Sequence, residues 1–124
     1  MNKLAVVNPV RDKPIVATHP LDAMIAAPEH HLVLFENERV RVLDTLLPPG
    51  QRTEVHAHEW PAALYVLSWS DFIRRAADGA LLVDSRGGPQ HAPGASLWID
   101  PLPAHSVENV GAADLHIIAV EVKS

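Results

Sequence analysis

Proline and glycine are so frequent in this chain that they leave little room for a long helix. The 124 residues include 11 prolines and six glycines, which divide the sequence into short apolar runs. Apolar and β-branched residues dominate eight segments: 32–35, 39–47, 62–69, 71–76, 80–84, 96–99, 105–110 and 115–122. Several short strands separated by turn signals indicate an all-β sandwich or barrel.

The ends of these segments carry residues that favour turns. Asn37 and Glu38 separate the first two runs, and Pro48-Pro49-Gly50 ends the second. Ala77-Asp78-Gly79 has the composition of a hairpin turn, with glycine where a positive φ is needed. We therefore expect a tight turn between 32–35 and 39–47, and a hairpin between 71–76 and 80–84.

The first 28 residues differ in character from the rest. They mix extended apolar pieces with one short stretch, 21–27, that is compatible with a helix. We predict an extended N-terminal arm over 1–28 and one barrel domain over 29–124. The arm is expected to wrap around the barrel or to pair with a second copy of the chain.

Composition narrows the classes of function. Apolar residues make up 48% of the chain, which is typical of a globular protein. The net charge of -5 and the scattered Lys and Arg residues argue against nucleic acid or an anionic membrane surface as partner. The absence of cysteine excludes disulfides and thiolate metal ligands. No targeting segment or membrane span is visible in the sequence, so a cytoplasmic protein is the expectation.

Histidine is the residue type that carries the functional signal, with eight copies in the chain. His56 and His58 are spaced i and i+2, so on a strand their side chains point to the same side. If that side faces the interior of a barrel, both imidazoles reach one metal ion. Imidazole binds zinc, iron, copper and nickel alike, so the pair does not identify the metal.

Two spaced segments resemble the motifs of the cupin family. Gly50, His56 and His58 have the form G-x5-H-x-H of the first cupin motif. Gly94, His105 and Asn109 stand at the spacing of the second, G-x5-P-x-G-x2-H-x3-N. Asp100 and Leu102 replace the proline and glycine of that motif. The resemblance covers roughly residues 32–122 and implies a small RmlC-like cupin, a single-domain β-barrel of the jelly-roll or double-stranded β-helix type.

The resemblance also implies a metal site, with His105 as the third ligand beside His56 and His58. The family places a glutamate ligand where this chain has Ala62 or Ala63. Glu59 follows His58 directly and is expected to face the other side of the strand unless a bulge rotates it inward. The site therefore resembles the three-histidine variant of the family, with Fe, Zn, Ni, Mn or Cu as the ion.

The remaining polar and aromatic candidates are weighed against simpler structural roles. Tyr65 and His116 are candidate catalytic residues if their side chains line the cavity, whereas packing is the commoner role of such residues. The other histidines and three arginines are expected on the solvated surface: His19, His30, His31, His91, Arg41, Arg74 and Arg75. The three tryptophans are expected to be core or dimer contacts: Trp60, Trp69 and Trp98.

Three classes of function follow from these predictions. The first is a metal-dependent enzyme, and the resemblance points toward three-histidine iron dioxygenases acting on a small polar molecule. The second is a binding module that uses the same pocket without turnover. The third is a metal-free structural cupin. Cupins of this size are commonly dimers, so we expect a homodimer with a small-molecule ligand.

Overall fold

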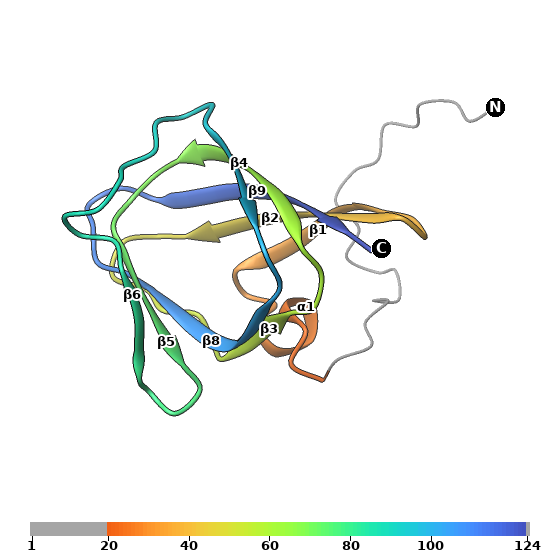
Figure 1. The fold of residues 1–124 in the computed structure, drawn as a ribbon, viewed down its shortest axis with the longest axis horizontal. Helices are drawn as coiled ribbons and strands as arrows, with labels where there is room; N and C mark the ends of the chain where they lie inside the picture. The colour runs from red at the N-terminus through yellow and green to blue at the C-terminus, as the bar shows by residue number, and fades with distance from the viewer. Residues whose placement is uncertain (1–19, 124) are drawn as a thin grey trace.

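The computed structural model of the chain describes residues 20–123 and consists almost entirely of β-strands (Figure 1). The predicted helix over 21–27 is present as a shorter helix, α1. The eight predicted strand segments are confirmed, and most bounds agree within one or two residues. A ninth, short strand carries the H-x-H pair. The elements are α1 (Ala23–Ala26), β1 (His31–Glu36), β2 (Val40–Leu47), β3 (His56–His58), β4 (Ala62–Ser68), β5 (Phe72–Ala76), β6 (Leu81–Asp84), β7 (Ser96–Ile99), β8 (Leu102–Asn109) and β9 (Leu115–Val122).

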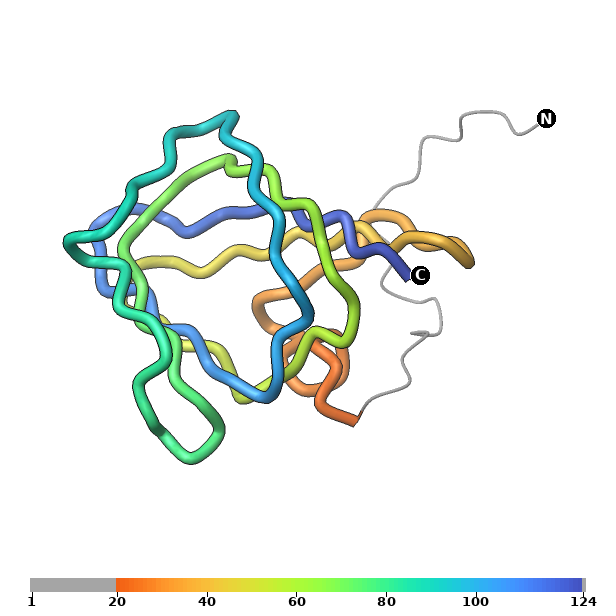
Figure 2. The backbone as a smooth tube through the Cα atoms, viewed as in Figure 1, coloured from red at the N-terminus to blue at the C-terminus, as the bar shows by residue number. Residues whose placement is uncertain are grey.

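The strands form two antiparallel sheets that enclose the interior (Figure 2). The first sheet has five strands in the order β1-β2-β9-β4-β7, and the second has four in the order β3-β8-β5-β6. Strands that are distant in sequence are therefore neighbours in space, as β2, β4 and β9 are. The hairpin of β5 and β6 extends away from the rest of the molecule (Figure 1). Its turn places Gly79 at φ 91°, the positive value expected from the sequence.

Alternation along the strands decides which side chains face the interior. In β9, Leu115, Ala119 and Glu121 are buried, whereas the intervening residues are more accessible. A buried apolar cluster forms at one part of the interior from Met24, Val33, Leu43, Ala62 and Ala119. This cluster joins α1 to the five-stranded sheet, so the short helix is part of the barrel's core.

Arg41 is the main exception to the expected arrangement. Its alternation with Val40 and Val42 was predicted to place the arginine on the solvated face of β2, and this prediction is wrong. Arg41 is fully buried and donates two hydrogen bonds to Asp22, from Nη1 at 3.0 Å and Nη2 at 2.7 Å. Its Nε donates to Glu121 at 2.7 Å. A period of two defines two faces but does not say which is buried, and here two carboxylates compensate the buried guanidinium.

Strand β8 begins earlier than predicted. The sequence favoured a start at His105, after a proline-rich turn, but β8 starts at Leu102 and includes Pro103. Proline has no N–H group to donate to a neighbouring strand. This is tolerated at Pro103 because the pairing of β8 with β5 begins only at His105, opposite Ala76. The carbonyl of Pro103 accepts a hydrogen bond from His105 instead.

The described part of the N-terminal segment is docked on the barrel. Asp22 caps α1 by accepting a hydrogen bond from Met24 N at 3.0 Å. The N–H of Ala57, between the two histidines of β3, donates to the carbonyl of Leu21 at 2.7 Å. Residues 1–19 of the predicted arm lie outside the described residues. Within 20–123, none of the helices is long and apolar enough to cross a membrane.

Candidate metal centre

Three histidines from two strands converge on one point. His56 and His58 lie on the same side of β3, as their spacing predicted, and their ring centroids are 4.9 Å apart. His31, the first residue of β1, lies 4.7 Å from the His56 ring and 5.6 Å from the His58 ring. One ring nitrogen of each of the three lies within 4.8 Å of the corresponding atoms of the other two. That spacing allows all three to bind a single ion.

His105 adjoins this group from the neighbouring strand. It is the register partner of His56 in the pairing of β3 with β8. Its ring centroid is 4.5 Å from that of His56 and 5.5 Å from that of His58. The predicted trio of His56, His58 and His105 is therefore brought together, although its role as a ligand set stays a prediction. We refer to these three residues with His31 as the histidine cluster.

All four imidazoles of the histidine cluster are held through the same ring nitrogen. Each Nδ1 lies within hydrogen-bond distance of an oxygen acceptor: Ala27 O for His31 (2.8 Å), Glu54 O for His56 (2.7 Å), Pro103 O for His105 (2.7 Å) and Glu121 Oε2 for His58 (3.2 Å). Because a carbonyl or carboxylate oxygen can only accept, Nδ1 carries the proton in every case. Each Nε2 therefore keeps its lone pair, the form in which imidazole binds a metal.

The surroundings keep three of the four imidazoles uncharged. Burial, together with the neighbouring imidazole of His58, lowers the pKa of His31 to about 3. Burial and the adjacent His31 and His58 lower the pKa of His56 to about 2. Burial is also the main cause that lowers the pKa of His105 to about 4. At neutral pH His31, His56 and His105 are therefore neutral donors.

Glu121 is the carboxylate that belongs to this site. It is 1% exposed, and it accepts hydrogen bonds from both Arg41 and His58. On β9 it pairs in register with Ala62, one of the two positions where the cupin motif was expected to have glutamate. A carboxylate therefore lies on the strand adjacent to that position, where it orients a histidine. Glu59 is half-buried, as His58 is, and its expected orientation away from the site stays a prediction.

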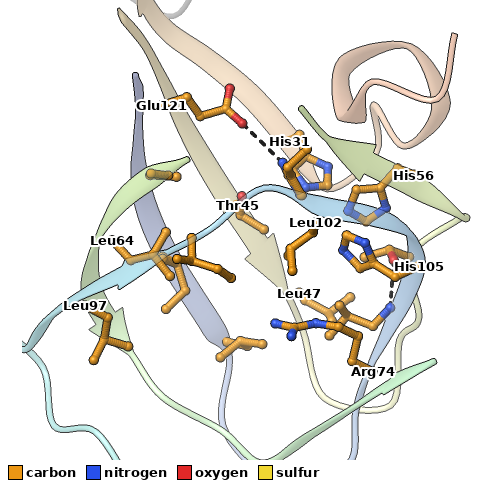
Figure 3. A pocket seen from close by; sticks show the side chains of 18 of the residues that line it. His31, Thr45, Leu47, His56, Leu64, Arg74, Leu97, Leu102, His105 and Glu121 are labelled. Atoms are coloured by element: carbon orange, nitrogen blue, oxygen red, sulfur yellow. Dashed lines mark hydrogen bonds and ion pairs between the residues drawn. The ribbon is translucent and has the colours of Figure 1, made fainter. Parts of the chain in front are cut away.

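The histidine cluster occupies one end of a cavity of about 250 Å³ between the two sheets (Figure 3). The walls are mainly apolar, and Leu64 and Leu97 lie on the side away from the histidines. The lining also includes Thr45, Thr53, Arg74 and Glu121. A cavity of this size is slightly smaller than the usual range for ligand sites, roughly 300–1,000 Å³.

Comparison with solved structures identifies this architecture. A cupin domain from Bordetella pertussis Tohama I superposes with a TM-score of 0.61 at 22% identity, over 76% of this chain and 92% of that chain. The fold is that of a cupin. An RmlC-like cupin with a double-stranded β-helix fold from Methanocaldococcus jannaschii gives a TM-score of 0.51 at 14% identity, over 73% of this chain and 75% of that one. The polyketide cyclase RemF from Streptomyces resistomycificus gives 0.53 at 18% identity, over 100% and 80%. No protein-family model and no curated protein sequence matches the chain.

The two candidate catalytic residues do not line the cavity. Tyr65 is 48% exposed and is absent from the described cavity lining, so the condition set for its catalytic role is not met. His116 is on the opposite face of β9 from Leu115, Ile117 and Glu121, which line the cavity. Its Nε2 lies 2.7 Å from Asp44 Oδ1 on the neighbouring strand β2. The condition set for a catalytic role of His116 is therefore not met either.

Sequence reasoning missed three cavity residues. His31 was expected at the surface, but it is 4% exposed and shares the inward phase of β1 with Val33. The alternation along β1 could have predicted that His31 faces inward with Val33. It was not applied to His31 because the predicted strand began one residue later, at Leu32. Arg74 and Trp69 also line the cavity. The inward position of Arg74 was harder to predict, because an arginine beside a second arginine on β5 favours an exposed face.

The donor set fits a divalent transition metal. Each of the four imidazoles has its Nδ1 fixed by an oxygen acceptor and its Nε2 uncommitted, the arrangement found around metal-bound histidines. The carboxylate–histidine pair of Glu121 and His58 matches the outer support that such sites commonly have. With no thiolate in the chain, the set suits iron, zinc, nickel or copper rather than a soft-ligand site.

Proposed function

We propose that this cupin is a metal-dependent enzyme that acts on a small molecule bound in the cavity between its sheets. The observation that carries the proposal is the shared orientation of the four histidines. Each holds its Nδ1 against an oxygen acceptor and presents Nε2 at one end of an otherwise apolar cavity. His31, His56, His58 and His105 are the proposed ligands.

The residues of the site have separate roles: some would bind the metal, some orient the ligands, and some form the apolar walls. A bound transition metal would supply Lewis-acid activation of an oxygen donor or, as iron, reactivity toward dioxygen. Imidazole ligands carry no negative charge, so the ligand set itself would not diminish the charge of the ion. Glu121 orients His58, and Arg41 holds Glu121 in place. The leucine-rich walls exclude water and receive the apolar part of a substrate.

Two reactions are compatible with this centre. Iron-dependent dioxygenation is the first, because a neutral histidine set is what the sequence resemblance associates with dioxygenases. Cyclisation of a carbonyl compound is the second, since RemF, with the same fold, is a polyketide cyclase and the cavity here is largely apolar. Oxygen consumption separates the two, because only the first reaction uses dioxygen.

The proposal is tested first by metal content. Untagged protein purified without chelator is expected to contain about one divalent transition metal per chain by inductively coupled plasma mass spectrometry. His31→Ala and His56→Ala are expected to lose most of it. His116→Ala is the matched control, because His116 is also paired with a carboxylate but lies on the outer face of β9. Metal-free protein that takes up none of the offered ions would overturn the proposal.

A further inference from the structure

Arg74 stands in the cavity wall with a buried hydrogen-bond donor that has no acceptor. Its Nε is inaccessible to solvent and is bonded to nothing within residues 20–123. The side chain comes from β5, adjoins His105 and points into the cavity (Figure 3). Its guanidinium carbon lies 5.6 Å from the centre of the Phe72 ring, which lines the same cavity.

Trp69 supplies a second donor of the same kind. Its indole Nε1 is also buried with no acceptor among the described residues, and the ring lines the cavity. It packs edge-on against Phe72, with centroids 5.7 Å apart. Phe72 therefore contacts both the indole and the guanidinium, and both unpaired donors belong to one side of the cavity.

The charges around the cavity leave the Arg74 cation uncompensated. Glu121 is committed to Arg41 and His58. Asp100, the other acid of the lining, is exposed and accepts from Trp98 Nε1 at 3.3 Å. The four histidines cannot offset this charge, because an imidazole is either neutral or positively charged. The buried, unpaired Nε–H of this cation costs free energy, and an anionic partner from outside the chain would offset that cost.

We propose that Arg74 and Trp69 bind the anionic group of the substrate, so that the enzyme acts on a carboxylate or similar oxyanion attached to an apolar body. The guanidinium is suited to two parallel hydrogen bonds with a carboxylate, and the indole N–H adds a third donor. The apolar body lies against the leucines, within reach of the histidine cluster. This inference rests on the proposed function for the role of the histidines, but the anion site itself is defined by Arg74 and Trp69.

The test uses benzoate as the probe and benzamide as its uncharged counterpart. Binding is measured by calorimetry on metal-free and on zinc-loaded protein, and the Arg74 Nε–H resonance is followed by ¹⁵N-edited NMR. We expect benzoate to bind, benzamide to bind at least tenfold more weakly, and the Nε–H resonance to shift on addition of benzoate. Arg74→Gln is expected to weaken benzoate binding by about tenfold or more.

Two further variants sharpen the test. Trp69→Phe keeps an aromatic ring but removes the N–H, so a smaller loss of about threefold to tenfold is expected. Arg75→Gln is the matched control, since Arg75 is the adjacent arginine of β5 but is not part of the cavity lining. It should leave benzoate binding within twofold of wild type. Circular dichroism and the melting temperature confirm that each variant is folded.

The outcomes separate this inference from the proposed function. If zinc binds and benzoate binding is the same in wild type and Arg74→Gln, the anion site is refuted and the metal centre stands. If no metal binds but benzoate still depends on Arg74, the metal centre fails and the anion site stands. No detectable binding of benzoate or of a longer homologue, phenylacetate or hexanoate, to either form also overturns the inference.

Discussion

Replacing Glu121 with glutamine tests whether this carboxylate sets the protonation of His58. Glu121 accepts from Arg41 Nε at 2.7 Å through Oε1 and from His58 Nδ1 at 3.2 Å through Oε2. Glutamine has a single acceptor oxygen, and the shorter, charge-assisted bond to Arg41 is expected to retain it. The new NH₂ group then faces His58 and can only donate. His58 must accept through Nδ1, so its proton moves to Nε2 and the lone pair needed for metal binding is lost.

The size of the effect follows from this geometry. Loss of an outer hydrogen-bond partner of a metal-binding histidine typically weakens metal affinity by about 10–100-fold, or roughly 1.4–2.7 kcal/mol. Removing one partner of a buried ion pair costs about 3–5 kcal/mol when nothing replaces it. Here Asp22 keeps both of its hydrogen bonds to Arg41, and the glutamine oxygen keeps the third. We therefore expect the free energy of unfolding of the metal-free protein to fall by only about 1–3 kcal/mol.

The assay is competition for Zn²⁺ and Co²⁺ against a chromophoric chelator, with urea unfolding of the metal-free protein in parallel. Asp44→Asn is the control, because Asp44 pairs with His116 in the same manner on the outer face of the sheet. In a His58→Ala background, Glu121→Gln should cause no further loss of metal affinity. A folded Glu121→Gln protein that binds both ions within twofold of wild type would refute the role assigned to Glu121.

Three further predictions concern stability. As pH falls below 6.5, the histidines of the unfolded, metal-free chain become protonated, whereas buried His31, His56 and His105 stay neutral in the folded protein. Urea titrations should therefore show the free energy of unfolding falling by up to about 1.4 kcal/mol per pH unit for each histidine, until each reaches its folded-state pKa between about 4 and 2. An unchanged free energy of unfolding between pH 7 and 5 would contradict the pKa assignments. Asp22→Asn should cost about 3 kcal/mol or more, because it removes a charge paired with buried Arg41; a loss below 1 kcal/mol would mean that the ion pair is unimportant. Leu43→Ala should lower the free energy of unfolding by about 2–5 kcal/mol, because it leaves a cavity in the core. The metal content per folded chain should stay the same. A matching loss of metal would contradict the separation of core and site.

The fold was predictable because turn residues and apolar runs alternate so regularly. Eight of the nine described strands were predicted within a few residues, and the hairpin at Gly79 has the positive φ that its composition predicted. The pairing order of the strands was not predictable from local patterns alone. It depends on contacts between distant segments, such as β2 with β9 and β4 with β9, whereas the cupin resemblance predicted only the type of barrel.

The site was predictable only in part, for a physical reason. His56 and His58 were identified because i and i+2 spacing fixes a common side of a strand whatever the rest of the chain does. His31 and Arg74 were missed because burial of a polar residue depends on partners from other strands, which a single sequence does not reveal. Arg41 shows the same limit, since its inward position is made acceptable by Asp22 and Glu121, which are 19 and 80 residues away.

The hydrogen bond between His31 and the carbonyl of Ala27 couples the short helix α1 to the histidine cluster. If the docked helix increases the affinity for an ion, a bound ion must stabilise the docked position of the helix by the same free energy. Segment 20–28 would then be protected from proteases in proportion to ion occupancy. Cleavage in this segment would in turn weaken ion binding, so the segment before β1 would control how firmly the barrel retains its ion.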